Sequence, residues 1–228
     1  MKKRYYIFLA VMSFISTVFT SCGDDEDIPT DKIAASDKGT FTDLRDGNIY
    51  TWVRYGNLDW FAENFRYDLQ DETQCRLYVM EDNVTKLDAK KYGRIYTYQG
   101  AVEACPDGWR LPTDEDWKNL EMQMGMSAAD ADGMEWRGNI ANRMMTKYGE
   151  TPDINILLTG YYSPNIVMGK TGYKFFSTKG YYWTATSDTD KGSGFYFFRE
   201  FMYNNAGVRR MSTTDYFYMS VRYVRDAQ

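Results

Sequence analysis

The sequence predicts an α+β domain built on a twisted antiparallel sheet with two or three helices. Aromatic residues make up 17% of the 228 residues, and aromatic side chains are enriched in strands. The C-terminal part alternates β-prone segments with turns rich in Gly, Asn, Asp and Ser, which is typical of antiparallel sheet and not of βαβ units. These segments are residues 154–162, 181–186, 194–203, 208–211 and 216–224.

Strands are also expected at the start of the domain, over residues 41–65. Asp46-Gly47 is a tight-turn pair, and Tyr55-Gly56-Asn57 has the composition of a hairpin turn. Residues 68–91 are charged and irregular, and we interpret them as an insertion with one strand near residues 76–80. Residues 93–96 return to the strand pattern, and a short helix is expected over residues 97–104.

The chain from Cys105 to Trp117 ends one helix and starts the next. Pro106 cannot continue a helix, and Pro106-Asp107-Gly108 is turn chemistry. Thr113 is a good N-cap with Asp116 three residues later, a variant of the capping box. Trp117, Leu120 and Met124 follow as an inward stripe that ends before Gly125. Residues 126–150 are expected to form a loop with a helical piece over 139–147.

Residues 1–22 have the pattern of a secretory leader. Lys2, Lys3 and Arg4 precede the apolar run from Tyr5 to Phe19, which is too short to span a bilayer comfortably. Phe19-Thr20-Ser21-Cys22 resembles the lipobox of bacterial lipoproteins, in which the cysteine is lipidated. An ordinary signal peptide with an incidental cysteine is the alternative.

The residues after Cys22 indicate a tether. Gly23-Asp24-Asp25-Glu26-Asp27 is an acidic run that resembles the surface-export signal of Bacteroidota lipoproteins, and a solvated acidic face is the simpler explanation. We interpret residues 23–39 as an acidic and polar tether and residues 40–228 as the folded domain. The expected location is the outer membrane, lipid-anchored through Cys22 and exposed at the cell surface.

Charge and composition exclude several functions. Removal of the leader leaves 24 basic and 32 acidic residues, a net charge of −8, whereas a nucleic-acid binder would show a basic face. The sequence has no histidine, which excludes His-based triads, His-ligated metals and imidazole pH switches.

Ordered motifs over residues 41–226 carry a family resemblance. They are Asp46-Gly47-Asn48-Ile49-Tyr50, Trp60-Phe61-Ala62-Glu63-Asn64-Phe65, Tyr92-Gly93-Arg94-Ile95-Tyr96, Ala104 to Thr113, Gly160-Tyr161-Tyr162, Tyr182-Trp183-Thr184-Ala185-Thr186 and Ser220 to Asp226. Together they resemble the Fibrobacter succinogenes major paralogous domain (FISUMP) family, found on secreted and surface proteins. Residues 110–117 are also similar to a segment of formylglycine-generating-enzyme-like domains, which implies a C-type-lectin-like fold.

The resemblance also bears on the cysteines. The family usually has cysteine where this chain has Tyr223, and that cysteine would be the partner of the one at Cys105. Cys105 is therefore expected to be free or to pair with Cys75, the other cysteine of the domain, because an exported compartment permits disulfides. Arg222, in the same motif, is expected to pair with a carboxylate.

We expect no enzyme activity, metal or cofactor. The chain lacks the C-terminal cysteine pair that a formylglycine-generating oxidase needs, and Cys105 has no histidine to activate it. Carboxylates at 130–135 and 188–190 do not complete a calcium loop. Glu63 and the acids at 114–116 could be imagined as a glycosidase pair, but capping already explains the latter.

Aromatic side chains are the remaining functional candidates. Tyr161, Tyr162, Tyr181 and Trp183 lie near predicted loops, where such rings can stack on sugars or anchor a protein partner. The alternative is that they fill an aromatic core, which is the favoured interpretation for Trp183. The sequence thus predicts a non-catalytic binding module for a glycan or a protein. A structural or assembly component of the envelope without a small ligand is the alternative.

Overall fold

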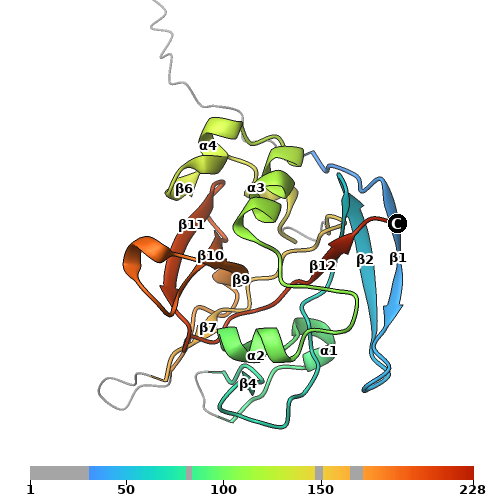
Figure 1. The fold of residues 1–228 in the computed structure, drawn as a ribbon, viewed down its shortest axis with the longest axis vertical. Helices are drawn as coiled ribbons and strands as arrows, with labels where there is room; N and C mark the ends of the chain where they lie inside the picture. The colour runs from blue at the N-terminus through green and yellow to red at the C-terminus, as the bar shows by residue number, and fades with distance from the viewer. Residues whose placement is uncertain (1–30, 81–83, 147–150, 165–171) are drawn as a thin grey trace, which may run out of the picture.

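The computed structural model describes residues 31–80, 84–146, 151–164 and 172–228 (Figure 1). The strands in this part of the chain are β1 (Asp37–Thr42), β2 (Ile49–Tyr55), β3 (Leu58–Phe61), β4 (Cys75–Arg76), β5 (Ile95–Tyr96), β6 (Glu135–Arg137), β7 (Tyr161–Tyr162), β8 (Tyr173–Lys174), β9 (Lys179–Ser187), β10 (Phe195–Met202), β11 (Val208–Thr214) and β12 (Val224–Asp226). The helices are α1 (Ala89–Tyr92), α2 (Tyr98–Glu103), α3 (Asp114–Gln123) and α4 (Ala128–Asp132), with 3₁₀ turns at Ala141–Arg143 and Thr189–Lys191.

Two four-stranded antiparallel sheets form the framework. The first has the order β1-β2-β3-β12 and the second β6-β11-β10-β9, and β4-β5 and β7-β8 are two small ribbons. The α+β class is therefore confirmed, with two main sheets in place of the single sheet expected. Four helices are described instead of two or three, because α1 and α4 are four- and five-residue turns that leave little periodic signal.

The first sheet contains the hairpin that the sequence predicts. Tyr55 pairs with Leu58 across the Gly56-Asn57 turn, and Gly56 adopts the left-handed backbone (φ +60°) that favours glycine. On its other side β3 pairs with β12, whose Val224 lies opposite Trp60. The last strand of the chain thus completes a sheet begun by the first.

The second sheet separates two cores. Tyr182 and Phe201 point to one face, where they pack with Trp117 of α3, while Tyr181, Trp183 and Phe198 belong to the other core. The long strand β10 pairs with β9 and β11 over most of its length, with an irregularity between Tyr196 and Phe198. In Figure 1, α3 and α4 lie over the end of this sheet near β6 and β11.

The C-terminal segment 218–226 ties the two sheets together. Ser220 accepts a hydrogen bond from Trp183 N at 3.3 Å and donates one to Tyr181 O at 3.0 Å, beside β9. Met219 pairs with Tyr96, and Val224 exchanges hydrogen bonds with Arg110. A segment expected to be one strand is therefore a series of short pairings with several elements.

The domain begins earlier than residue 40. Residues 37–39 belong to β1, Ala35 N donates to Asp153 Oδ2 at 2.9 Å, and Tyr55 Oη donates to Ile33 O at 2.9 Å. Ile33 and Ala35 also pack against the core. The polar composition of residues 23–39 had assigned Ile33 and Ala35 to the tether. Because their apolar side chains pack on the core, residues 31–39 of the predicted tether lie on the domain. The leader, Cys22 and residues 23–30 lie outside the described residues.

Candidate functional site

The motif from Arg110 to Trp117 builds the start of α3. Thr113 Oγ1 accepts a hydrogen bond from Asp116 N at 3.1 Å, and Asp116 Oδ2 accepts one from Thr113 N at 2.7 Å. The capping box predicted from the sequence is confirmed, with Asp in the place usually held by Glu or Gln. Arg110 pairs with the same Asp116 carboxylate at 2.5 Å, which leaves that carboxylate fully engaged in local structure.

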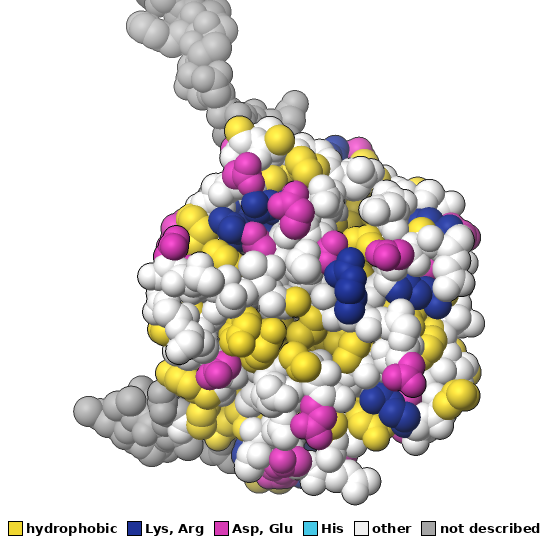
Figure 2. Space-filling view, in the orientation of Figure 1, with side chains coloured by type: hydrophobic (Ala, Val, Ile, Leu, Met, Phe, Trp, Pro, Cys, Tyr) yellow, Lys and Arg dark blue, Asp and Glu magenta, His cyan; other side chains and the backbone are white. Residues whose placement is uncertain are grey.

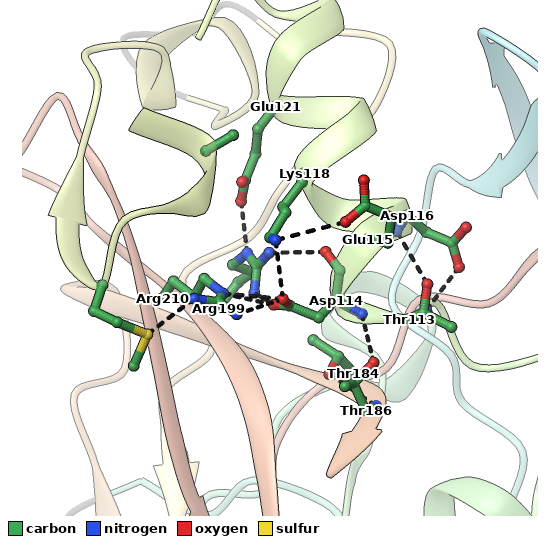
Figure 3. A network of polar contacts seen from close by, with 12 residues as sticks. Thr113, Asp114, Glu115, Asp116, Lys118, Glu121, Thr184, Thr186, Arg199 and Arg210 are labelled. Atoms are coloured by element: carbon green, nitrogen blue, oxygen red, sulfur yellow. Dashed lines mark hydrogen bonds and ion pairs between the residues drawn. The ribbon is translucent and has the colours of Figure 1, made fainter. Parts of the chain in front are cut away.

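Beneath this cap lies a buried set of charges, the α3 ion network (Asp114, Glu121, Arg137, Arg199 and Arg210), part of which is shown in Figure 3. Arg199 of β10 pairs with Asp114 and with Glu121, both at 2.6 Å. Arg210 of β11 reaches Asp114 at 2.7 Å, and Arg137 of β6 reaches Glu121 at 2.9 Å. Three strands each give one arginine to two carboxylates of α3, so the network holds the helix on the sheet.

The pKa of Asp114 reflects these partners. Burial acts to raise the pKa of this carboxyl, but the hydrogen bonds and charges of Arg210 and Arg199 outweigh burial and hold the pKa below its usual value. A carboxylate kept ionised by two arginines cannot act as a general acid near neutral pH. Glu63 is likewise engaged, with Arg66 at 2.9 Å and with Thr51 N at 2.9 Å.

Two other family motifs meet in the interior. Arg222 Nε donates to Asn64 Oδ1 at 2.8 Å, and its Nη1 donates to Phe61 O and Ile154 O, both at 2.9 Å. The expected carboxylate partner is thus replaced by carbonyl and amide oxygens, and burial lowers the pKa of the guanidinium. Asn64 in turn donates to Tyr92 O at 3.0 Å, so these motif residues cross-link the fold.

Cys75 and Cys105 are free thiols in the structure. Cys75 Sγ faces Tyr67 O at 3.7 Å, whereas Cys105 Sγ faces Trp109 O at 3.2 Å. Of the two alternatives that the sequence left open, the structure shows the free cysteines and not the Cys75–Cys105 bridge. Burial raises the pKa of both thiols, that of Cys105 to about 12, which leaves neither as a thiolate nucleophile at neutral pH.

Three of the four candidate aromatic residues are largely inside. Trp183 is 0% exposed and its Nε1 donates to Tyr96 O at 2.8 Å, so it has no free face for a ligand. Tyr181 packs with Phe198 at the surface of the second core. Tyr162 belongs to a small third core with Tyr78, Ile95, Tyr173 and Tyr218. These aromatic residues have similar surroundings in the sequence, but the face of the sheet on which each side chain lies places them in different cores.

Tyr161 is the candidate that remains partly exposed, and it is the centre of an aromatic strip (Phe175, Tyr161, Phe217 and Tyr216). Its ring centroid lies 5.8 Å from that of Phe175 and 5.5 Å from that of Phe217, and Phe217 stacks on Tyr216 at 5.0 Å. Phe175 is 43% exposed and Tyr216 is 39% exposed. The strip is therefore a row of partly exposed rings beside the buried Tyr181, which contacts Tyr161 edge-on.

The backbone presents Phe175 in an unusual way. Phe175 has φ +66°, in the left-handed region that an aromatic residue rarely adopts, and its carbonyl accepts hydrogen bonds from Thr178 N and Lys179 N. Such a conformation costs on the order of 1–3 kcal/mol and concentrates at functional positions. Sequence analysis did not select Phe175, because neither the exposure of its side chain nor its positive φ produces a recognisable local pattern.

The charges of the surface are mixed. In Figure 2 the basic and acidic side chains of this face lie next to one another, and hydrophobic side chains form a band across its middle in the region of α2. No set of three or more Cys, Asp or Glu side chains among the described residues could hold a metal ion. Within the same described ranges, no helix is both long and apolar enough to cross a membrane.

These features define an α+β domain with two antiparallel sheets, in which residues of the sequence motifs form internal cross-links. The chain belongs to the Fibrobacter succinogenes major domain family, whose model matches residues 53–225. No curated protein and no solved structure matches the chain. The C-type-lectin-like label consequently stays a prediction.

Proposed function

We propose that this protein is a lipid-anchored, non-catalytic binding module of the cell envelope, and that its aromatic strip binds a glycan. The single observation that carries the proposal is the row of partly exposed rings centred on Tyr161, in which Phe175 is 43% exposed and has a left-handed backbone. Aromatic faces stack on the apolar faces of sugar rings at low entropic cost, because the rings are already held in place.

Polar groups beside the strip suit a polyhydroxylated ligand. The Glu200 carboxylate accepts hydrogen bonds from Lys179 Nζ at 2.6 Å and from Tyr181 Oη at 3.4 Å, next to Tyr161. Lys179 also lies 4.9 Å from the ring centroid of Phe175. Glu200 is buried and holds the Lys179 ammonium in place, whereas the Lys179 side chain is 22% exposed. A sugar that covered Phe175 would therefore meet this ammonium at its edge.

A glycan array probed with the purified protein tests the strip. Replacement of Phe175 and Tyr216 by alanine should weaken binding about tenfold, since each ring contributes about 0.5–1.5 kcal/mol. Tyr203→Ala is the control, because Tyr203 is also 43% exposed but lies in the turn between β10 and β11, outside the strip. Equal binding by the strip variants and the wild type would refute this site. Silence on the whole array would favour the envelope-assembly role instead.

The membrane anchor is a separate part of the proposal and is supported by the leader and by Cys22. A lipidated chain should partition into the detergent phase of a cloud-point extraction, because each buried CH₂ contributes about 0.8 kcal/mol. Cys22→Ala should move the protein to the aqueous phase. Partition of the wild type into the aqueous phase would overturn the anchor while leaving the aromatic strip unaffected. Protease accessibility on intact cells tests exposure at the outer surface.

A further inference from the structure

A polar cleft of about 370 Å³ lies on the other side of β7 from the aromatic strip. Tyr161 and Tyr162 are consecutive residues of this strand, and their side chains point to opposite faces. Tyr161 centres the strip, whereas the Tyr162 ring lies under Arg76, which lines the cleft. The lining comes from separate parts of the chain and includes Asp68, Asp71, Glu72, Arg76 and Arg94.

Arg76 is held by aromatic residues. Its Cζ lies 4.7 Å from the ring centroid of Tyr162 and 5.4 Å from that of Tyr218. Among the described residues no carboxylate pairs with Arg76, and its buried Nε has no hydrogen-bond acceptor. Burial acts to lower the pKa of this guanidinium, but the oxygens of Tyr218 and Tyr173 outweigh it and keep the pKa above its usual value. The site therefore holds a permanent cation.

The acidic residues of the cleft are disposed differently. Asp68 pairs with Arg94, and Asp71 accepts hydrogen bonds from Thr73 N at 2.8 Å and Thr73 Oγ1 at 2.7 Å. Glu72 is exposed at the rim. A ligand in the cleft thus meets a cation on one side and carboxylate acceptors on the other. A simple inorganic anion would be attracted by the guanidinium of Arg76 and repelled by the carboxylates of Asp71 and Glu72.

We propose that this cleft binds an acidic sugar, with the sugar carboxylate on Arg76 and the sugar hydroxyls donating to Asp71 and Glu72. Planar guanidinium groups bind carboxylates in a bidentate manner, and carboxylates accept hydrogen bonds from hydroxyl groups. An acidic peptide offers the carboxylate but lacks the row of hydroxyl donors, so the chemistry favours the sugar.

The surroundings leave room for more than one sugar unit. A second cleft, of about 530 Å³, shares Asp68 and Arg94 with the first and is lined further by Asn48, Arg66 and Lys90. The ion pair between Arg94 and Asp68 is therefore a wall common to both clefts. This arrangement fits an oligosaccharide that contains uronic acid and extends from one cleft past the wall to the other.

Saturation-transfer NMR with the purified protein tests the proposal. The probes are a galacturonate trisaccharide, a glucuronate-containing trisaccharide, and the methyl ester of each, which keeps the sugar and removes the charge. The acid forms should bind and the esters should bind at least about tenfold more weakly, because a charged hydrogen-bonded contact is lost. Inorganic phosphate should not compete. Equal binding of acid and ester, competition by phosphate, or no binding of either acid at about 1 mM would overturn the proposal.

Variants locate the site. Arg76→Gln should weaken binding of the acid forms about tenfold or more, and Arg76→Lys should lie between Gln and the wild type because it keeps the charge without the planar fork. Lys38→Gln removes a charge on β1, outside the cleft, and should bind like the wild type. Thermal melting shows whether Arg76→Gln is folded, and Arg76→Lys decides the question if it is not. Unchanged binding in a folded Arg76 variant would refute the cleft.

Discussion

Arg199 and Arg76 show two ways of removing a guanidinium from water. Arg199 is completely buried and its charge is balanced by Asp114 and Glu121, each at 2.6 Å. Arg76 is partly buried, its guanidinium lies against the rings of Tyr162 and Tyr218, and no described carboxylate balances it. The charge of Arg199 is neutralised within the fold, whereas among the described residues the charge of Arg76 meets only tyrosine rings and oxygens. This difference distinguishes an arginine with a structural role from the arginine that we propose binds a ligand, in a chain with many acidic and basic residues.

The largest effect is expected from breaking the α3 ion network. Arg199→Met should lower the free energy of unfolding by about 3–5 kcal/mol, because Asp114 and Glu121 lose a buried partner. Urea denaturation measures the change. Arg209→Met is the control on the neighbouring strand: Arg209 pairs with Glu135 and Glu200 but is 27% exposed, so about 1 kcal/mol or less is expected. Similar losses in both variants would contradict the distinction.

Protonation should weaken the same network more mildly. The pKa of Asp114 is held below its ordinary value of 3.8, so the unfolded chain takes up this proton first as the pH falls. The stabilisation is fully present well above pH 4 and is lost as the pH falls from there through the folded-state pKa. Urea midpoints at pH 7 and pH 3 should differ in the wild type. The drop should be smaller in Asp114→Asn, and an equal drop would exclude Asp114 as the titrating group.

The capping box should contribute less than the network beneath it. Thr113→Ala removes the hydroxyl that accepts from Asp116 N and should cost about 1 kcal/mol. Ser127 caps α4 in the same way, with its Oγ accepting from Asp130 N at 3.0 Å. Because α4 has five residues and an exposed cap, Ser127→Ala should cost less than Thr113→Ala in the same denaturation assay.

The smallest effect on stability is expected at Arg76. Replacement by Gln removes two contacts between a cation and aromatic rings, each contributing about 0.5–1 kcal/mol at partly exposed sites, but it also relieves a charge without a carboxylate. The free energy of unfolding should therefore change by less than about 1 kcal/mol. A loss as large as that of Arg199→Met would show that Arg76 is structural and would remove the contrast.

The parts of the fold that were predicted from the sequence are those whose structure depends on a single short segment of the chain. The α3 cap, its apolar stripe and the Tyr55–Leu58 hairpin each depend on neighbours in the chain, so local rules found them. Strand β6 and helix α4 were missed, since their three and five residues are set by packing against β11 and α3. The start of the domain was predicted too late in the chain. Ile33 and Ala35 are two apolar residues among polar neighbours, and two residues are too few to show strand or helix periodicity.

The candidate sites were less accessible to sequence analysis. Tyr161 was selected for its position near a loop, but its neighbours Phe175 and Phe217 are brought to it by tertiary structure. Trp183 shared the same local signal and proved to be core. Arg76 was not selected at all, because the cleft around it joins residues near 70, 90 and 173, and the rings of Tyr162 and Tyr218 below it.

The pairings of residues 218–226 also set the order in which the molecule can fold. This segment contacts Trp60, Tyr96, Arg110, Tyr162 and Tyr182, so the pairs it makes span up to most of the chain length. Contacts of such sequence separation are formed late and slow the folding of β-rich domains. Until residues 218–226 have paired, the edge of β3 that faces β12 is unpaired. The backbone groups of β9 that bond to Ser220 are also unpaired. In that interval the unpaired backbone groups can bind other strands, and chaperones that cover strand edges would act there.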